Sequence, residues 1–383
     1  MSDEQSMLRE SVLRFTAKYY DFSRYRKTVR AGGFDGEAWR HICDQGWIAA
    51  AIGEKHGGLG GLREAAIIAE ELGAALVVEP YLAAVQTADL LQGDESMRTV
   101  LNAHLAGTCL VASALAESRA RGSVAHVATM AKPTVDGFIV RGKKTMVRGI
   151  PPASKLLVSA RTSGAISDTH GISLFLLDAI SPGILIERVR LIDGSIGANV
   201  TLSDVVADSA SKVGEMHHAY PILLRSVEAL TIVAGADTLG MMERVIALSI
   251  DQLKTRRQFG VLLSSFQVLQ HRLADMATDL EISRAILDVA LLAREEADAT
   301  ERSRAFASAR TLIGELGRSV CAAGIQFHGG TGMTEEHPVG HYLQRLQVLD
   351  ALQGHPSCHL DEYAASLKHE TSQDYGYAVD RRR

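Results

Sequence analysis

The sequence has few aromatic residues, little net charge and no long apolar run, and each shortage excludes a class of protein. Aromatic residues make up 5% of its 383 residues, and only two of them are Trp. The net charge of −5 gives no general attraction to nucleic acid or to an anionic membrane. No stretch approaches the roughly 20 uncharged apolar residues of a membrane span, and the N-terminal segment MSDEQSMLRESVLRF has no apolar run of signal-peptide length. We therefore expect a soluble cytoplasmic protein without a nucleic-acid or membrane partner.

Cysteine is also scarce. The four Cys residues lie far apart without CxxC or zinc-like spacing, which predicts reduced thiols. Several His residues lie near the C-terminus, but no two of them have a third ligand at metal spacing; they are His328, His337, His341, His355 and His359. The sequence predicts no metal site.

The remaining composition is that of a globular enzyme, with 46% hydrophobic and 22% charged residues. The length predicts two or three domain-sized units. Apolar residues recur at helical spacing over residues 1–107 and again, in longer runs, over residues 216–383. Between them, residues 108–215 contain short β-rich runs that alternate between apolar and polar positions, typical of an antiparallel sheet or barrel. The long C-terminal helices are apolar on two sides, which indicates a bundle that forms oligomers.

The first motif is KTRRQFG, at the end of a long helical run. A guanidinium followed by Phe and Gly offers a bidentate donor for a phosphate beside an aromatic surface. The alternative is a charged helix end, in which Arg256 and Arg257 complement the helix dipole.

The second motif is the segment GIQFHGGTG. Gly329, Gly330 and Gly332 allow close approach of a ligand, and Gln326 can bond a phosphate or an adenine edge. A Rossmann site is not indicated, because the segment follows a helical pattern and not a strand. The alternative is a Gly-rich turn between two helices.

Together, the order of these motifs and the three-part organisation resemble the acyl-CoA dehydrogenase family over essentially the whole chain. The family signature looks like RxxFG followed by a Gln-containing helix, then QxxGGxG followed by PV. These elements stand at residues 256–260, Gln267, residues 326–332 and residues 338–339.

That resemblance implies an α+β multidomain fold. Its parts are an N-terminal helical domain, a middle antiparallel β-barrel-like domain and a C-terminal four-helix bundle, which bind FAD and an acyl-CoA thioester. The family reaction is α,β-dehydrogenation, in which a carboxylate removes the α-proton and the β-hydride passes to the flavin. The resemblance also implies contacts to the adenosine and pyrophosphate of an FAD held mainly by a neighbouring subunit; the residues are Arg256, Gln258, Phe259, Gln326, Gly329 and Gly330.

The catalytic base of the family is missing from both positions where relatives carry it. Most members place a Glu before a Gly-Thr pair, and here Gln353 precedes Gly354 and His355. Other relatives place it on the earlier long helix, at the position of Leu230 here. Glu228, two residues away, lies on another helix face. Neither an amide nor a hydrocarbon is a general base near neutral pH.

The flavin-ring half of the site departs from the family as well. Met146 stands where the family Trp covers the flavin, and Arg148 stands near the expected Thr. Trp39 and Trp47 both belong to the N-terminal segment. The residues expected at the adenine half of the site therefore match the family pattern, and those expected at the flavin-ring half do not.

This combination most closely resembles the small subunit of two-component, pimeloyl-CoA dehydrogenase-like enzymes. We expect an acyl-CoA dehydrogenase subunit whose homologous partner supplies the catalytic Glu. A self-sufficient enzyme, as a homo-oligomer with Asp350 as base, is the second hypothesis, although Asp350 equally suits an ion pair. A non-catalytic structural subunit is the third, and an oxidase or monooxygenase on the same fold also stays open.

Overall fold

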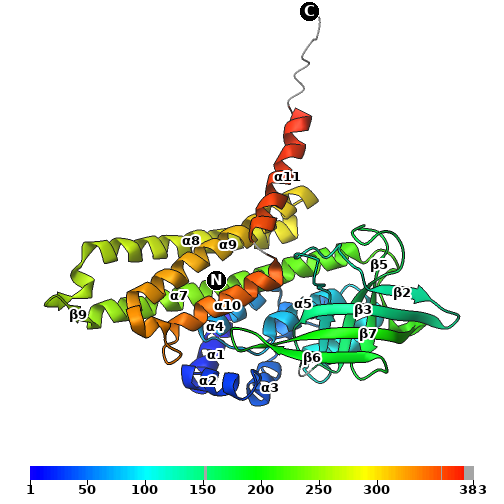
Figure 1. Cartoon of the computed structure of the whole chain (residues 1–383), viewed down its shortest axis with the longest axis horizontal. Coiled ribbons are helices and arrows are strands. Elements are labelled where there is room, and N and C mark those ends of the chain that lie inside the picture. The colour runs from blue at the N-terminus through cyan, green and yellow to red at the C-terminus, as the bar shows by residue number, and fades with distance from the viewer. Residues whose placement is uncertain (151–152, 355, 375–383) are drawn as a thin grey trace, which may run out of the picture.

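The computed structural model describes residues 1–150, 153–354 and 356–374. Helices precede and follow a β-sheet, as the sequence pattern predicts. Figure 1 shows the sheet at one end of the molecule and the long helices extending from it. The predicted boundaries at 107/108 and 215/216 fall in segments that connect these parts, and they stay predictions.

The N-terminal part is a group of short helices. A capping box between Ser2 and Gln5 begins the first of them, and Asp21 and Asp35 cap the next two. The helices are α1 (Asp3–Tyr19), α2 (Phe22–Arg30), α3 (Gly36–Asp44), α4 (Leu62–Ala74), α5 (Tyr81–Leu91) and α6 (Arg98–Leu105).

The middle part is one sheet of eight strands, mostly antiparallel. The strands are β1 (Val111–Ala114), β2 (Met130–Pro133), β3 (Gly137–Val147), β4 (Lys155–Arg161), β5 (Ile172–Asp178), β6 (Ile184–Arg190), β7 (Ile196–Asp208) and β8 (Lys212–Val213). Their order is β6-β7-β3-β2-β4-β5-β8, and β1 pairs in parallel with β4. Among the described strands no pairing joins β6 to β8, so the sheet is not shown to close into the expected barrel.

The C-terminal part contains the long helices. They are α7 (Tyr220–Thr255), α8 (Gln267–Glu296), α9 (Ala299–His328), α10 (Val339–Gln353) and α11 (Pro356–Asp374). The first four pack against one another as the expected four-helix unit, and α11 packs on α9 and projects from it (Figure 1). A hairpin of β9 (Arg257–Gln258) and β10 (Val261–Leu262) joins α7 to α8.

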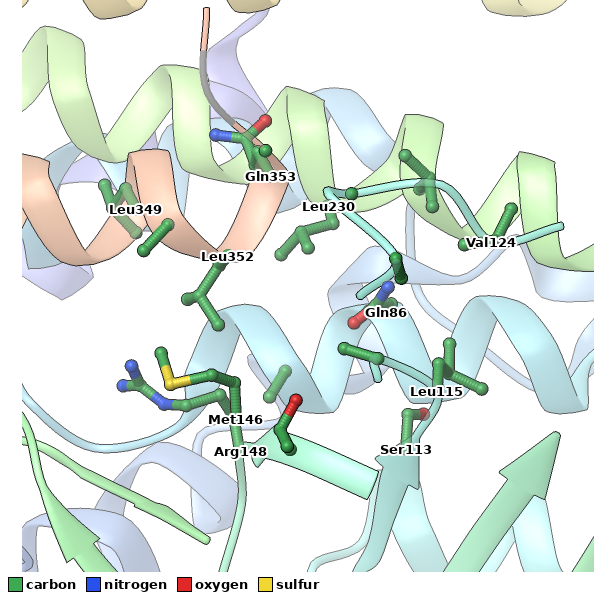
Figure 2. Close-up of a pocket in the computed structure, with 18 of the residues that line it drawn as sticks. Gln86, Ser113, Leu115, Val124, Met146, Arg148, Leu230, Leu349, Leu352 and Gln353 are labelled. Atoms are coloured by element: carbon green, nitrogen blue, oxygen red, sulfur yellow. The ribbon is translucent and has the colours of Figure 1, made fainter. Parts of the chain in front are cut away.

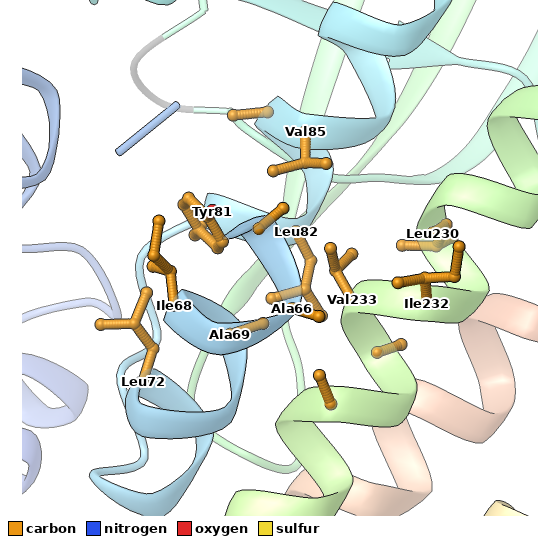
Figure 3. Packing of buried hydrophobic residues seen from close by; sticks show 14 of the residues in the cluster. Ala66, Ile68, Ala69, Leu72, Tyr81, Leu82, Val85, Leu230, Ile232 and Val233 are labelled. Carbon is orange, nitrogen blue, oxygen red and sulfur yellow. The ribbon is translucent and has the colours of Figure 1, made fainter. Parts of the chain in front are cut away.

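One core connects the N-terminal and C-terminal helices. Leu72 and Leu82 pack with Leu230 and Val233 in this core, where α4 and α5 meet α7 (Figure 3). The backbones of α4 and α7 touch at Gly240, because a Cβ there would lie 1.8 Å from the carbonyl oxygen of Glu70. This contact fixes α7 against the N-terminal helices, so that its first half forms one wall of a cavity.

Candidate active site

A cavity of about 700 Å³ lies where the three parts of the chain meet. Its walls come from the start of α5, the segment after β1, the end of β3, the first half of α7 and the C-terminal half of α10. The lining is mixed: apolar side chains such as Leu115, Leu349 and Leu352 alternate with Glu79, Arg148 and other polar groups. A cavity of this size and lining suits a small-molecule ligand.

Gln353 and Leu230 both line this cavity, on α10 and α7 respectively (Figure 2). The structure therefore brings together the two positions at which relatives carry the catalytic Glu. Gln353 Oε1 is buried and has no hydrogen-bond partner among the described residues. His355, which follows this position, lies outside the described residues. No carboxylate stands at either position.

Asp350 faces away from the cavity. Its carboxylate forms an ion pair with Arg318 of α9, and the residue is absent from the cavity lining although Leu349 and Ala351 belong to it. The geometry thus favours the ion-pair role of Asp350. Its role as a catalytic base stays a prediction.

Glu228 also lies on another face of its helix, as its helical position predicts. Its buried carboxylate pairs with Arg294 at 3.1 Å and with Arg302 at 3.0 Å. It does not line the cavity.

Glu117 lines the cavity, but its oxygens are fully engaged. Oε1 accepts hydrogen bonds from the Thr129 hydroxyl at 2.7 Å and from the buried Lys144 ammonium at 2.8 Å, and Oε2 accepts one from the Ala128 N–H. Burial opposes ionisation of Glu117, but Lys144 and these hydrogen bonds outweigh it and lower the pKa of the carboxyl. Glu117 is therefore an ionised structural group.

Glu79 is a cavity residue that the sequence reasoning missed. The side chain is 2% exposed, and its Oε1 accepts a hydrogen bond from the Asp35 N–H at 3.1 Å. Oε2 is buried without a hydrogen-bond partner among the described residues. Burial raises the pKa of Glu79 to about 7, although the nearby Tyr20 hydroxyl opposes the shift. The only sequence signal was a Glu-Pro pair before an apolar helix.

Met146 and Arg148 extend side by side from the end of β3 into the cavity wall (Figure 2). Within the described lining there is no aromatic side chain, since Trp39 and Trp47 are buried in the core of the N-terminal helices. Arg148 Nε and Nη1 have no hydrogen-bond partner among the described residues, and burial lowers the pKa of the guanidinium. No Trp therefore belongs to the described cavity lining, and the replacement of the ring-covering Trp by Met146 stays a prediction.

The residues expected at the adenine half lie together at a different place. Arg256 follows the end of α7 and donates from Nη1 to the His328 carbonyl at 3.3 Å, which brings the two motifs into contact. Gly329 ends α9 with a φ of 62°, and a Cβ there would lie 3.8 Å from Arg256 Nη1. Phe259, in the β9–β10 turn, is 91% exposed. Gln258, Gln326 and Gly330 are also exposed. Gln258 precedes Phe259 in the sequence, and Gln326 and Gly330 lie close to Gly329 in the sequence.

This surface is far from the cavity of the same chain. Leu230 lines the cavity and Arg256 ends the same helix, so a rise of 1.5 Å per residue separates them by about 39 Å. Figure 1 shows β9 at the end of the bundle away from the sheet. The exposed ring of Phe259, the Arg256 guanidinium and the open space beside Gly330 fit the adenosine and pyrophosphate of an FAD bound to another subunit.

Among the residues that the structure describes, no group of three or more His, Cys, Asp or Glu side chains is placed to hold a metal ion. Within the same ranges, no helix has the length and apolar character needed to cross a membrane.

Two family models match the chain. Residues 2–99 match "Acyl-CoA dehydrogenase, N-terminal domain" and residues 225–368 match "Acyl-CoA dehydrogenase, C-terminal domain". These two matches together cover more than half of the sequence and flank the β-sheet.

Individual proteins match over nearly the full length. Acyl-CoA dehydrogenase IpdE2 of Mycobacterium tuberculosis is 28% identical over 347 residues, which cover 90% of this chain and 91% of IpdE2. The caffeyl-CoA reductase-Etf complex subunit CarC of Acetobacterium woodii is 24% identical, with 92% of this chain and 95% of CarC covered. A solved structure of the Tcur3481–Tcur3483 steroid ACAD has a TM-score of 0.86 and 26% identity, covering 97% of this chain and 99% of its own.

Proposed function

The chain belongs to the acyl-CoA dehydrogenase family of FAD-dependent oxidoreductases, and from this premise we propose that it is a catalytically incomplete subunit that works with a homologous partner. The reaction is the α,β-dehydrogenation of an acyl-CoA thioester. One observation carries the proposal: Gln353 and Leu230, the two positions of the family base, line one cavity, and neither side chain is a carboxylate.

The missing carboxylate decides what this cavity can do. Removal of the weakly acidic α-proton needs a base within hydrogen-bond reach whose pKa lies near the working pH. The Gln353 amide is neutral and the Leu230 side chain is a hydrocarbon, so neither accepts the proton. When bound, FAD supplies the acceptor for the β-hydride. The chain's own cavity therefore has no proton acceptor at either position where the family places one.

The other part of the proposal is a contribution to the partner. Arg256, Phe259, Gln326 and Gly329 form an exposed surface about 39 Å along α7 from the cavity. In the proposed complex, the Arg256 guanidinium binds the pyrophosphate and the Phe259 ring lies against the adenosine of the partner's FAD. The partner supplies the catalytic Glu and the flavin-ring site.

The similarities to known proteins support a complex of different chains. The steroid ACAD structure bears two protein names, Tcur3481 and Tcur3483, and CarC is named as a subunit of an Etf complex. These names describe those proteins, and they make a two-chain assembly a reasonable arrangement for this one. The substrate class is an acyl-CoA thioester, as in the rest of the family.

Co-expression tests this proposal. The chain is produced alone and together with a homologous dehydrogenase that carries Glu at the position aligned with Gln353. We expect turnover of acyl-CoA and stable flavin absorbance only in the complex. A partner whose Glu is replaced by Gln is the control, and it should form the same complex without turnover. Full activity of this chain alone would reject the proposal, and a complex without bound flavin would favour a structural subunit.

A further inference from the structure

The cavity wall contains polar atoms whose hydrogen-bonding capacity is unused. Arg148 Nε and Nη1, Glu79 Oε2 and Gln353 Oε1 are all buried, and none has a hydrogen-bond partner among the described residues. All three side chains line the same cavity. Buried polar groups in proteins are almost always paired, so several unpaired groups on one cavity indicate that a ligand or ordered water pairs them.

The carboxylates nearest to Arg148 are already committed to another guanidinium. Asp237 forms a two-pronged ion pair with Arg345, through Nε at 2.8 Å and Nη2 at 2.5 Å. Asp193 lies 3.9 Å from Arg345 Nη1 and accepts hydrogen bonds from the N–H and hydroxyl of Ser195. The positive charge of Arg148 therefore has long-range compensation but no hydrogen-bonded anion.

Glu79 adds a second polar group on the N-terminal helical wall. Its Oε1 is satisfied by the Asp35 N–H, whereas Oε2 is free to bond a ligand. Because burial raises its pKa to about 7, the carboxyl keeps its proton through mildly acidic pH and can then donate from Oε2. Glu79 lies just before α5, whereas Gln353 and Leu230 belong to α10 and α7.

An unbranched hydrocarbon would suit this wall poorly. It would exclude water from Arg148 and Glu79 without supplying hydrogen bonds of its own, and leaving buried polar groups unpaired costs affinity. An acyl chain with a carbonyl, hydroxyl or carboxylate oxygen would accept from the Arg148 guanidinium and keep it paired. Sites built to bond a ligand oxygen discriminate strongly against analogues that lack it.

We propose that Arg148, assisted by Glu79, is a specificity residue that selects acyl-CoA thioesters whose acyl chain carries an oxygen function. This inference rests on the proposed function, since it takes the cavity to be an acyl-CoA site. The group bound is a hydrogen-bond acceptor oxygen of the acyl chain, and its sources are a neutral ketone or an acyl carboxylate.

Calorimetric binding separates these sources. The full chain, alone and in complex with its partner, is titrated with heptanoyl-CoA, a ketone-bearing heptanoyl-CoA and pimeloyl-CoA, which share one chain length. We expect at least one oxygenated thioester to bind about tenfold or more tightly than heptanoyl-CoA. Equal affinity for all three thioesters would overturn the inference and leave the proposed function standing. Binding of none of them would overturn both.

The variants Arg148→Met and Glu79→Gln complete the test. Arg148→Met should abolish the preference, whereas Arg141→Met, which removes an exposed guanidinium from the same strand, should preserve it. Loss of bound FAD in Arg148→Met with an unchanged thioester preference would assign Arg148 to the flavin and overturn the inference. Glu79→Gln retains hydrogen-bonding groups and should reduce the preference less than Arg148→Met does. Loss of all turnover in that variant would make Glu79 a base and contradict its assisting role. A thermal unfolding midpoint for each variant confirms that it is folded.

Discussion

Gln353 of α10 and Leu230 of α7 lie on adjoining walls of one cavity (Figure 2). The resemblance to the family places the catalytic Glu at one or the other position, and the two helices present both positions to the same space. This chain has a carboxylate at neither. The family base is thus missing from both helices that face the cavity and not only from one sequence position.

Asp350 should be dispensable for catalysis. Its carboxylate pairs with Arg318 outside the cavity lining, so Asp350→Asn in the complex should leave turnover within about twofold of the unmodified protein. The measurement is steady-state turnover together with flavin content. Abolished turnover with FAD still bound would instead support the self-sufficient enzyme.

Arg256 should matter for FAD retention by the complex. Arg256→Ala removes the guanidinium that contacts the His328 carbonyl beside Gly329, and we expect FAD to bind about tenfold more weakly. Flavin fluorescence measures FAD release. Arg257→Ala is the matched control, because Arg257 is an exposed neighbour with the same charge. Equal losses in the two variants would indicate a general charge effect and contradict a specific contact.

The Asp237–Arg345 pair should be a major stabilising contact between α7 and α10. Both side chains are buried, and Asp237→Asn would leave the Arg345 charge uncompensated except for Asp193. We expect the free energy of unfolding to fall by about 3–5 kcal/mol in urea titrations. The exposed Arg141–Asp204 pair is the control: Asp204→Asn should leave stability nearly unchanged. A similar fall in the free energy of unfolding in both variants would show that burial does not determine how much the ion pair stabilises the fold.

Glu79 should make stability depend on pH between its unfolded and folded pKa values. Its folded pKa of about 7 exceeds the ordinary value of 4.5, so the folded state binds the proton more tightly than the unfolded state. Its contribution is fully present below about pH 4.5 and is lost as the pH rises through about 7, by up to about 3 kcal/mol. Tyr20, Asp35 and Arg345 are the other charged or titratable groups around this region.

The measurement compares urea unfolding of the unmodified protein and Glu79→Gln across this pH range. The difference between the two curves isolates Glu79 from Glu71, whose pKa burial also raises to about 7. Parallel curves would show that Glu79 does not titrate in this window.

The sequence predicts the order of helical and β parts because hydrophobic spacing is a local signal. It also predicts that Gln353, Leu230 and Met146 belong to the site, because each position is counted from a motif in the same chain. All three residues line the cavity. Strand pairing is not local, and the expected barrel closure is not shown by the pairing of β6 through β8. Glu79 was missed for the same reason: its raised pKa and unpaired oxygen depend on residues that folding brings around it.

The partner of Asp350 could not be predicted either, because Arg318 belongs to a different helix. The sequence left Asp350 with two roles, and only its orientation on α10 distinguishes them. Arg148 was placed near the flavin ring by resemblance, but its lack of a hydrogen-bonded anion is visible only in the folded cavity.

The most direct test of the central claim is a single-turnover reaction of the chain without any partner. The purified chain is mixed anaerobically with FAD and an acyl-CoA thioester and followed by flavin absorbance, with the two-chain complex measured in parallel. We predict that the flavin bleaches in the complex and stays oxidised in the chain alone, because Gln353 and Leu230 provide no base. Bleaching of the chain alone at the rate of the complex would contradict the account.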